Sequence, residues 1–271
     1  MSQHNYKTII VRIENRTARV ELNRPKVHNA FNAVMIGELI QAFDSIKDNP
    51  EVRVAVLTGN GKSFCAGADL NWMKEIINYS FEQNLEESLQ IAQLHLKVHT
   101  LPKPTIALVN GAAIGGGTGF LSACDMALAA EDAVFGLSEV KIGLVPAAIS
   151  PYVVKKIGES RAREYFLTGK RISSRQACEI GLVNHVFPRD ELENQGQEII
   201  DLLLSSGPEA LANCKELLYR VPRMSPEEAE KFTAEMIARL RISEEGQEGM
   251  SAFLEKRSPE WVKNQKGKKD V

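Results

Sequence analysis

The sequence lacks several features that would assign it to a membrane, to the secreted disulfide-bonded proteins or to nucleic-acid binding. No window of its 271 residues approaches the roughly 20 apolar residues that a membrane helix needs. No two of its four cysteines are close enough for a CxxC motif, and a chain of this size does not depend on disulfide bonds, so we expect reduced thiols. The formal net charge of −2 argues against binding nucleic acid through an overall basic field.

The amino-terminal segment MSQHNYKTII also lacks the marks of a targeting peptide. It has no basic region followed by an apolar stretch, and it is not Arg-rich like a transit peptide. Hydrophobic residues make up 44% of the chain and charged residues 25%, which is ordinary for a globular protein with a sizeable core. We therefore expect a cytoplasmic protein that does not associate with a membrane.

The first 150 residues alternate between strand and helix patterns. Apolar-rich runs predict strands, and apolar residues at helical spacing predict two long helices. Alternation of this kind predicts an α/β fold. The predicted segments are a hairpin (Thr8–Ile13 and Ala18–Leu22), a helix (Asn32–Lys47), a strand (Val52–Thr58), a helix (Phe81–His99) and two further strands (Thr105–Val109 and Met126–Ala130).

Beyond residue 150 the pattern is helical. Ser150 offers an N-cap followed by proline, and Ser173 can cap a helix that stops at Gly181. Ser225 precedes a proline and has a glutamate three positions later, a strong signal for the start of a helix. Because no Gly/Ser linker marks an independent domain, we expect a core (1–200) and a helical carboxyl-terminal region (201–271) within one structural unit.

Two glycine-bearing segments follow predicted strands and lead into helices. They are Ser63–Leu70, which contains CAGADL, and Asn110–Gly119, which contains NGAAIGGG. The first N–H groups of a helix lack intrahelical partners, and small residues let a ligand oxygen approach them. Two such amides that converge on one oxygen form an oxyanion hole. Alternatively, these glycines only permit tight turns or close packing, whereas a dinucleotide fingerprint would require a different glycine spacing.

With these two segments, the chain resembles the crotonase (enoyl-CoA hydratase/isomerase) superfamily over nearly its whole length. The resemblance also includes the motifs NRPKVHNAFN (Asn23–Asn32), ACD (Ala123–Asp125), FGLSEV (Phe135–Val140) and GLV (Gly181–Val183). It implies a crotonase-like spiral of ββα units followed by a helical carboxyl-terminal region used for trimerisation. A narrower resemblance, carried by AGADLNWM and SEVKIGLVPAAISPY, points to hydratases of the methylglutaconyl-CoA and gamma-carboxygeranoyl-CoA type.

The resemblance implies a role for each of several positions. The amides of Ala68 and Gly116 would hold the thioester oxygen of an acyl-CoA, and Glu139 would transfer the proton. Phe253 and Lys256 would close over the CoA end, often from a neighbouring subunit. Positions expected to contact the substrate are Lys26, His28, Ala30, Ala66, Asp69, Leu70, Trp72, Gly115, Gly119, Ser138, Pro146, Phe253 and Lys256.

The chain departs from the family pattern at Gly119. Hydratases of the family carry two glutamates that share a water molecule, one ending a GGGxE segment and one in an FGxxE segment. Here the second is present as Glu139, whereas Gly119 stands in place of the first. Three possibilities follow: Glu139 serves both roles, another polar residue substitutes, or no water is added. A single glutamate is the arrangement associated with double-bond isomerases.

Other polar residues are interpreted as structural. Asp69 is expected to bond backbone amides at its turn, and Asp125 to cap or pair. His95 and His99 lie at i and i+4, but no HExxH glutamate accompanies them, so we interpret them as ordinary helix-face residues and expect no metal. Cys65 has no histidine partner by motif, and we expect it to pack in the core.

The sequence therefore predicts an enzyme that hydrates an α,β-unsaturated acyl-CoA, with a branched methylglutaconyl-type thioester as one candidate. CoA would arrive with the substrate, no other cofactor is expected, and the assembly would be a homotrimer or a dimer of trimers. The alternatives are an enoyl-CoA isomerase that uses Glu139 alone, an RNA-binding module and a non-catalytic acyl-CoA-binding protein. The acidic balance and the lack of an RNP or KH motif weigh against RNA.

Overall fold

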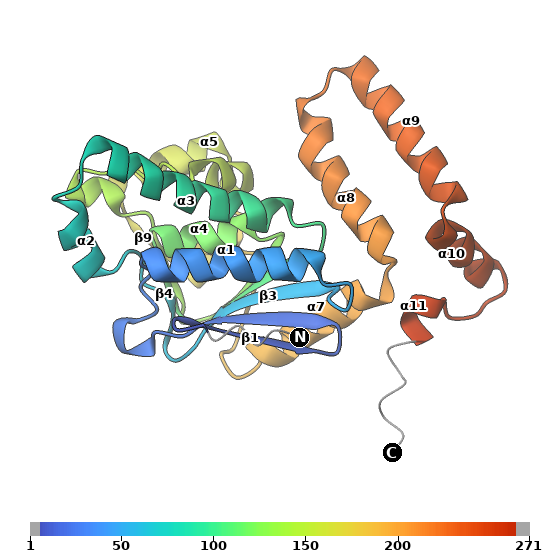
Figure 1. The fold of residues 1–271 in the computed structure, drawn as a ribbon, viewed down its shortest axis with the longest axis horizontal. Helices are drawn as coiled ribbons and strands as arrows, with labels where there is room; N and C mark the ends of the chain where they lie inside the picture. The colour runs from blue at the N-terminus through green and yellow to red at the C-terminus, as the bar shows by residue number, and fades with distance from the viewer. Residues whose placement is uncertain (1–5, 264–271) are drawn as a thin grey trace.

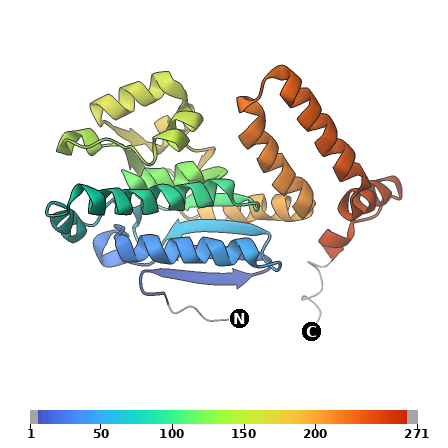
Figure 2. The ribbon, with the colours of Figure 1, turned by 45° about the horizontal axis from the view of Figure 1, so that its top comes forward.

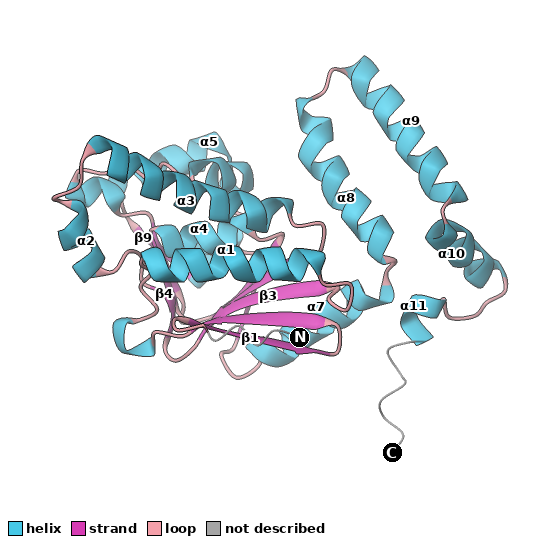
Figure 3. Ribbon diagram, viewed as in Figure 1, coloured by secondary structure: helices cyan, strands magenta, loops and turns pink. Residues whose placement is uncertain are grey.

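A computed structural model describes residues 6–263 of the chain, so the last residues of the predicted carboxyl-terminal region, 264–271, lie outside it. Two sheets form the centre of the core, and helices cover them (Figure 3). The larger sheet has the strand order β1-β2-β3-β5-β7-β10, in which β1 and β2 are antiparallel and the other pairs are parallel. Its strands are β1 (Ile9–Glu14), β2 (Thr17–Leu22), β3 (Val54–Gly59), β5 (Thr105–Val109), β7 (Met126–Ala130) and β10 (His185–Phe187).

Helices pack on both faces of the larger sheet. Alternate residues of β3 face opposite ways: Ala55 and Leu57 join the main core, while Val54 and Val56 pack with Leu204 and other residues of α7 (Leu192–Ser205). A strand that is covered on both faces reads as a continuous apolar run, which is why β3 and β5 are predictable from sequence. The main core lies under α1 (Ala33–Asp48), α3 (Phe81–Thr100) and α4 (Gly116–Ala123) (Figures 1 and 2).

The smaller sheet consists of four strands of three residues each, in the order β4-β6-β8-β9. They are β4 (Ser63–Cys65), β6 (Ala112–Ile114), β8 (Val134–Gly136) and β9 (Arg171–Ser173). None of these strands was predicted, because three residues are too short to establish a period of two. The remaining core helices are η1 (Pro25–Val27), α2 (Leu70–Ile76), η2 (Glu139–Ile142), α5 (Ser150–Thr168) and α6 (Ser174–Glu179).

Helix starts follow the predicted caps with one exception. Ser173 and Ser225 both form capping boxes, whereas the prediction that Ser150 caps α5 is wrong. The Ser150 N–H already bonds the carbonyls of Pro146 and Ala147, so the chain is helical at Ser150, and its hydroxyl donates to the Ala147 carbonyl instead. The turn that precedes α5 therefore makes a side-chain cap unnecessary.

The last helices form an arm that stands away from the core (Figure 1). This C-terminal arm, residues 207–263, contains α8 (Pro208–Arg220), η3 (Val221–Arg223), α9 (Pro226–Ile242), α10 (Glu244–Leu254) and α11 (Glu260–Lys263). Within one chain α8 has no fully buried residue, and α9 buries only Met236. An ion pair of 2.5 Å from Lys215 Nζ to Asp125 Oδ2 connects α8 to the core. The α/β prediction with carboxyl-terminal helices is confirmed.

No helix in the described part of the chain is long and apolar enough to cross a membrane.

Candidate active site

Three neighbouring strands of the smaller sheet end at one edge and deliver three loops to the same place. β4, β6 and β8 are parallel, with Cys65 opposite Ala113 and Ile114 opposite Gly136. Ligands of α/β proteins bind outside the carboxyl ends of such strands. The loops that follow carry Ala68, Gly116 and Glu139, so the fold gathers the three predicted catalytic positions at one edge of the small sheet.

Two backbone amides in these loops are unpaired among the described residues. Around Ala68, the N–H of Phe31 donates to Gly67 at 2.9 Å and the N–H of Asp69 donates to Phe31 at 2.8 Å, but the N–H of Ala68 makes no hydrogen bond. Gly116 is the first residue of α4, where an N–H has no intrahelical acceptor. Both amides are therefore free to donate to a ligand oxygen.

Glycines allow the two amide-bearing loops to approach each other closely. A Cβ on Gly117 would lie 2.3 Å from the carbonyl oxygen of Cys65, at the end of β4. Gly115 has φ +54° and ψ −122°, a conformation that side chains disfavour. Its N–H donates to the Gly136 carbonyl at 2.8 Å, which ties the start of α4 to the end of β8. The glycine-rich segment thus positions α4, as well as making room for a ligand.

Glu139 lies beside this turn with a partly desolvated carboxyl group. It is the first residue of η2 and is half-buried. Its Oε1 lies 3.1 Å from where a Cβ on Gly115 would be, and its buried Oε2 has no hydrogen-bond partner among the described residues. Burial raises the pKa of Glu139. A carboxyl group with a raised pKa, beside Gly115 at the start of α4, is suited to accept and return a proton.

Burial of Glu139 predicts a pH-dependent gain in stability when its charge is removed. A group with a folded pKa above its unfolded pKa stabilises the fold at low pH, and this contribution is lost as pH rises through the folded pKa. Glu139→Gln is therefore expected to raise the melting temperature at neutral pH. The difference in melting temperature should shrink as pH falls towards the ordinary pKa of a glutamate. Thermal melts of Glu139→Gln and of the unaltered protein, recorded side by side at each pH, measure it. An equal gain at every pH would show that ionisation of Glu139 is not its source.

At Gly119, there is no room for the side chain that the family pattern would place there. A Cβ would lie 2.2 Å from Ile149 Cγ2 and 2.7 Å from His95 Nε2. The interpretation of His95 as an ordinary helix-face residue is therefore wrong: it is fully buried, and its ring stacks on Phe120 and Tyr152 at centroid distances of 5.2 and 5.8 Å. Burial lowers its pKa to about 4. The sequence signal for the burial of His95 was its position on α3 between the apolar residues Leu94 and Val98, which are also buried.

Asp69 and Asp125 have the structural roles expected of them. Asp69 caps α2, accepting from the Asn71 N–H at 2.7 Å, and it pairs with Arg24 at 2.6 Å. Burial alone would raise the pKa of Asp69, but the bonds from Asn71 and Arg24 lower it. Asp125 accepts from both the N–H and the hydroxyl of Thr105 and pairs with Lys215. Both carboxylates are therefore held in place by hydrogen bonds and an ion pair.

Cys65 packs in the core as expected. It is fully buried at the end of β4, and burial raises the pKa of its thiol to about 12. A thiol with that pKa is protonated at neutral pH and is a poor nucleophile.

Most of the expected substrate contacts surround the loops that carry Ala68 and Glu139. Trp72 is buried on α2, donates to Glu87 Oε1 at 3.1 Å and meets the Phe31 ring edge to face, while Leu70 is exposed. The Lys26–Ala30 segment lies against the Ala66–Ala68 segment, since the Ala66 N–H donates to the His28 carbonyl at 3.0 Å. Ser138 is half-buried and Pro146 is buried on either side of η2.

Phe253 and Lys256 are not brought to this site within one chain. Phe253 lies on α10, and Lys256 follows that helix at φ +55°. Both views of the ribbon place α10 at the opposite end of the molecule from α2 (Figures 1 and 2). Their expected role at the CoA end therefore requires a second subunit and remains a prediction.

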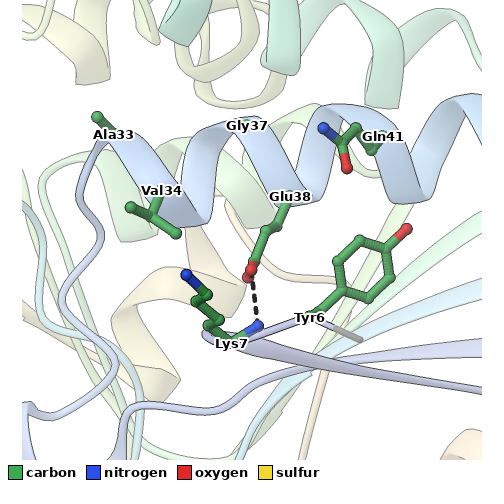
Figure 4. A pocket seen from close by; sticks show the side chains of 7 residues that line it. All are labelled: Tyr6, Lys7, Ala33, Val34, Gly37, Glu38 and Gln41. Atoms are coloured by element: carbon green, nitrogen blue, oxygen red, sulfur yellow. Dashed lines mark hydrogen bonds between the residues drawn. The ribbon is translucent and has the colours of Figure 1, made fainter. Parts of the chain in front are cut away.

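A separate hollow lies between the start of β1 and helix α1 and has no comparable chemistry. Figure 4 shows the Glu38 carboxylate turned towards the backbone of Lys7. That carboxylate accepts from the N–H groups of Lys7 and Thr8 at 2.6 and 2.8 Å, so its charge is already compensated. This hollow joins the amino-terminal segment to α1 and is not the candidate active site.

Comparison with known proteins agrees with the fold and shows the family. Residues 12–265 match the family model described as enoyl-CoA hydratase/isomerase. A solved structure of an enoyl-CoA hydratase from Shewanella pealeana is 43% identical, with a TM-score of 0.92, covering 95% of this chain and 97% of that one. A short-chain-enoyl-CoA hydratase from Clostridium acetobutylicum is 34% identical over 94% of this chain and 98% of its own length. A 2,3-dehydroadipyl-CoA hydratase from Escherichia coli is 32% identical over 93% and 98%.

The fold and these likenesses define an enzyme of the crotonase superfamily. Within it, the chain belongs to the enoyl-CoA hydratase/isomerase family. The expected ββα spiral is confirmed at the level of the fold.

Proposed function

We propose that the protein hydrates an α,β-unsaturated acyl-CoA at the edge of the small sheet. The observation that carries this proposal is the convergence of two unpaired amides, of Ala68 and Gly116, with the partly desolvated carboxyl group of Glu139. The relatives named as hydratases support the same reaction class.

The residues account for each step of an addition of water. The amides of Ala68 and Gly116 donate to the thioester oxygen and stabilise the negative charge that develops there. The Glu139 carboxylate takes a proton from water as the hydroxyl oxygen bonds the β-carbon and the electrons move onto the thioester oxygen. Protonated Glu139 then delivers that proton to the α-carbon, which restores the thioester and the carboxylate. The raised pKa of Glu139 makes its carboxylate a stronger base.

Isomerisation of a 3-enoyl-CoA is the second candidate, because Gly119 supplies no second carboxylate. Glu139 alone would then move a proton between two carbons of the enolate formed in the same oxyanion hole. The two functions differ in whether water is consumed. Incubation with crotonyl-, tiglyl- and methylglutaconyl-CoA, followed by loss of the enoyl-thioester absorbance, tests hydration. Conversion of a 3-enoyl-CoA without any such loss would replace the hydratase proposal with the isomerase.

We infer a branched, methylglutaconyl-type thioester as the finer substrate class. Its support is the likeness of the AGADLNWM and SEVKIGLVPAAISPY segments to hydratases of that type. The acyl group would lie near α2 and η2, where the exposed Leu70, Ile142 and Leu144 supply apolar surface. A kcat/KM for methylglutaconyl-CoA no higher than for crotonyl-CoA would argue against this class.

The C-terminal arm supports assembly into a trimer or a dimer of trimers. Its helices α8 and α9 have almost no buried residues in one chain. Large apolar side chains of the arm are also exposed: Leu218 of α8 by 71%, Ile242 of α9 by 80% and Phe253 of α10 by 83%. Exposed apolar surface of this kind marks a protein interface. Light scattering after gel filtration is expected to give three or six times the chain mass, and Leu218→Glu is expected to shift it to smaller species. A monomer at micromolar concentration would contradict this.

A further inference from the structure

Phe31 lies between the two loops that carry the amides of Ala68 and Gly116, and its backbone is tied to the first of them. Phe31 and Ala68 form an isolated parallel β-bridge. In this bridge the Phe31 N–H donates to the Gly67 carbonyl at 2.9 Å, and the Asp69 N–H donates to the Phe31 carbonyl at 2.8 Å. Because both neighbours of Ala68 point their polar groups at Phe31, the Ala68 N–H points to the opposite side of the extended chain and stays free for a ligand.

The Phe31 side chain reaches the second loop. The edge of its ring lies so close to Gly116 that a Cβ there would be 2.6 Å from Cε1 and 2.7 Å from Cζ, closer than such atoms approach one another in proteins. The ring is buried, and it meets the rings of Trp72 and Phe120 edge to face at centroid distances of 5.8 and 5.5 Å. It therefore rests against the backbone of α4 at the first residue of that helix, a contact that requires glycine there.

An arginine clamp fixes the bridge that carries the ring. The Arg24 guanidinium donates to the Ala30 carbonyl and pairs with the Asp69 carboxylate at 2.6 Å. One side chain thus joins the residue before Phe31 to the residue after Ala68. The position of the ring is therefore set by the same backbone that holds the Ala68 amide.

We propose that Phe31 is a positioning residue that sets the separation of the Ala68 and Gly116 amides, an inference that rests on the proposed function. Two amides act on one oxygen only when both lie about 2.7–3.1 Å from its place in the transition state. Since the backbone of Phe31 is bonded to one loop and its ring touches the other, the ring is a spacer between them. A ring that only filled the core would need no glycine opposite it, because a Cβ on α4 would fill the same space.

Phe31→Leu tests the proposal, because it keeps an apolar side chain and removes the ring edge that meets Gly116. We expect kcat for hydration to fall by about 10- to 100-fold with little change in KM, since a misplacement of ~1 Å can cost about 10²-fold in rate. Exchange of the α-proton of a saturated acyl-CoA with D2O uses the same amides to stabilise the enolate. It is therefore expected to fall by the same factor as hydration.

Phe43→Leu is the matched control. It makes the same substitution in another buried ring of the main core, on α1, and both rates are expected to stay near those of the unaltered protein. Hydration by Phe31→Leu as fast as by Phe43→Leu would overturn the proposal. If the unaltered protein exchanges α-protons but hydrates no enoyl-CoA, the proposed function fails, and exchange alone then measures the effect of Phe31.

A double variant provides a second, independent test. Gly116→Ala alone adds a Cβ that collides with the Phe31 ring, whereas in Phe31→Leu combined with Gly116→Ala the added methyl group occupies part of the space that the ring leaves. The double variant is therefore expected to have a higher kcat than Gly116→Ala, although each single change lowers kcat. Losses that simply multiply would contradict the spacer role. If Phe31→Leu melts early, the double variant decides: recovery of the melting temperature without recovery of kcat would assign Phe31 to packing alone.

Discussion

Glu139→Gln is expected to lower kcat for hydration by about 10³-fold, within the range that a positioned acid–base group contributes. The amide keeps the size of the side chain beside Gly115 but can neither take the proton from water nor deliver one to the α-carbon. KM should change little, because the thioester oxygen is still held by the amides of Ala68 and Gly116. Steady-state rates with a 2-enoyl-CoA, together with α-proton exchange, provide the measurement, and both should fall.

Glu131→Gln is the control for this prediction. Glu131 is exposed at the turn before β8. Its substitution therefore replaces the same carboxylate by the same amide away from the site. Full turnover by Glu139→Gln would show that another residue carries the proton. If hydration falls while α-proton exchange stays intact, Glu139 would act only on the water molecule, and another group would protonate the α-carbon.

Gly116→Pro is expected to reduce kcat by about 10²–10³-fold, the effect of removing one oxyanion donor. Proline has no N–H, and the first position of a helix tolerates it because no intrahelical bond is lost there. The new ring also carries a Cβ, which would lie 2.6 Å from the Phe31 ring. The rate must therefore be compared with that of a variant that has the same crowding.

Gly116→Ala provides that comparison, since it adds the Cβ and retains the N–H. Both variants are expected to lose some activity through displacement of Phe31, and the excess loss in Gly116→Pro measures the amide. Equal rates for the two would mean that the Gly116 amide does not touch the reacting oxygen. Thermal melts of both variants show whether either change disturbs α4.

The parts of the fold that were predictable from sequence are those with a clear period. α1 and α3 place apolar residues at helical spacing, and β3 and β5 are continuous apolar runs because helices cover both faces of their sheet. The capping boxes at Ser173 and Ser225 are local, so their sequence alone defines them. The prediction that Ser150 caps α5 failed because the hydrogen bonds of the preceding turn already form the start of the helix.

The site was predictable only in part, because its geometry depends on contacts between distant segments. The motifs pointed to Ala68, Gly116 and Glu139, but their meeting follows from the register of β4, β6 and β8, each too short to predict. His95 was misjudged for the same reason. Its spacing from His99 is a local feature, whereas its proximity to Gly119 results from the packing of α3 against α4.

The C-terminal arm also affects how the protein reaches its native state. α8 and α9 have almost no residues buried within their own chain. If other subunits cover them, their folded structure would depend on protein concentration. The strands and helices that carry Ala68, Gly116 and Glu139 precede the arm in the chain, and amino-terminal units generally fold first during synthesis. The order of folding would then run from core to arm to assembly, and dilution would loosen the arm before it disturbs the core.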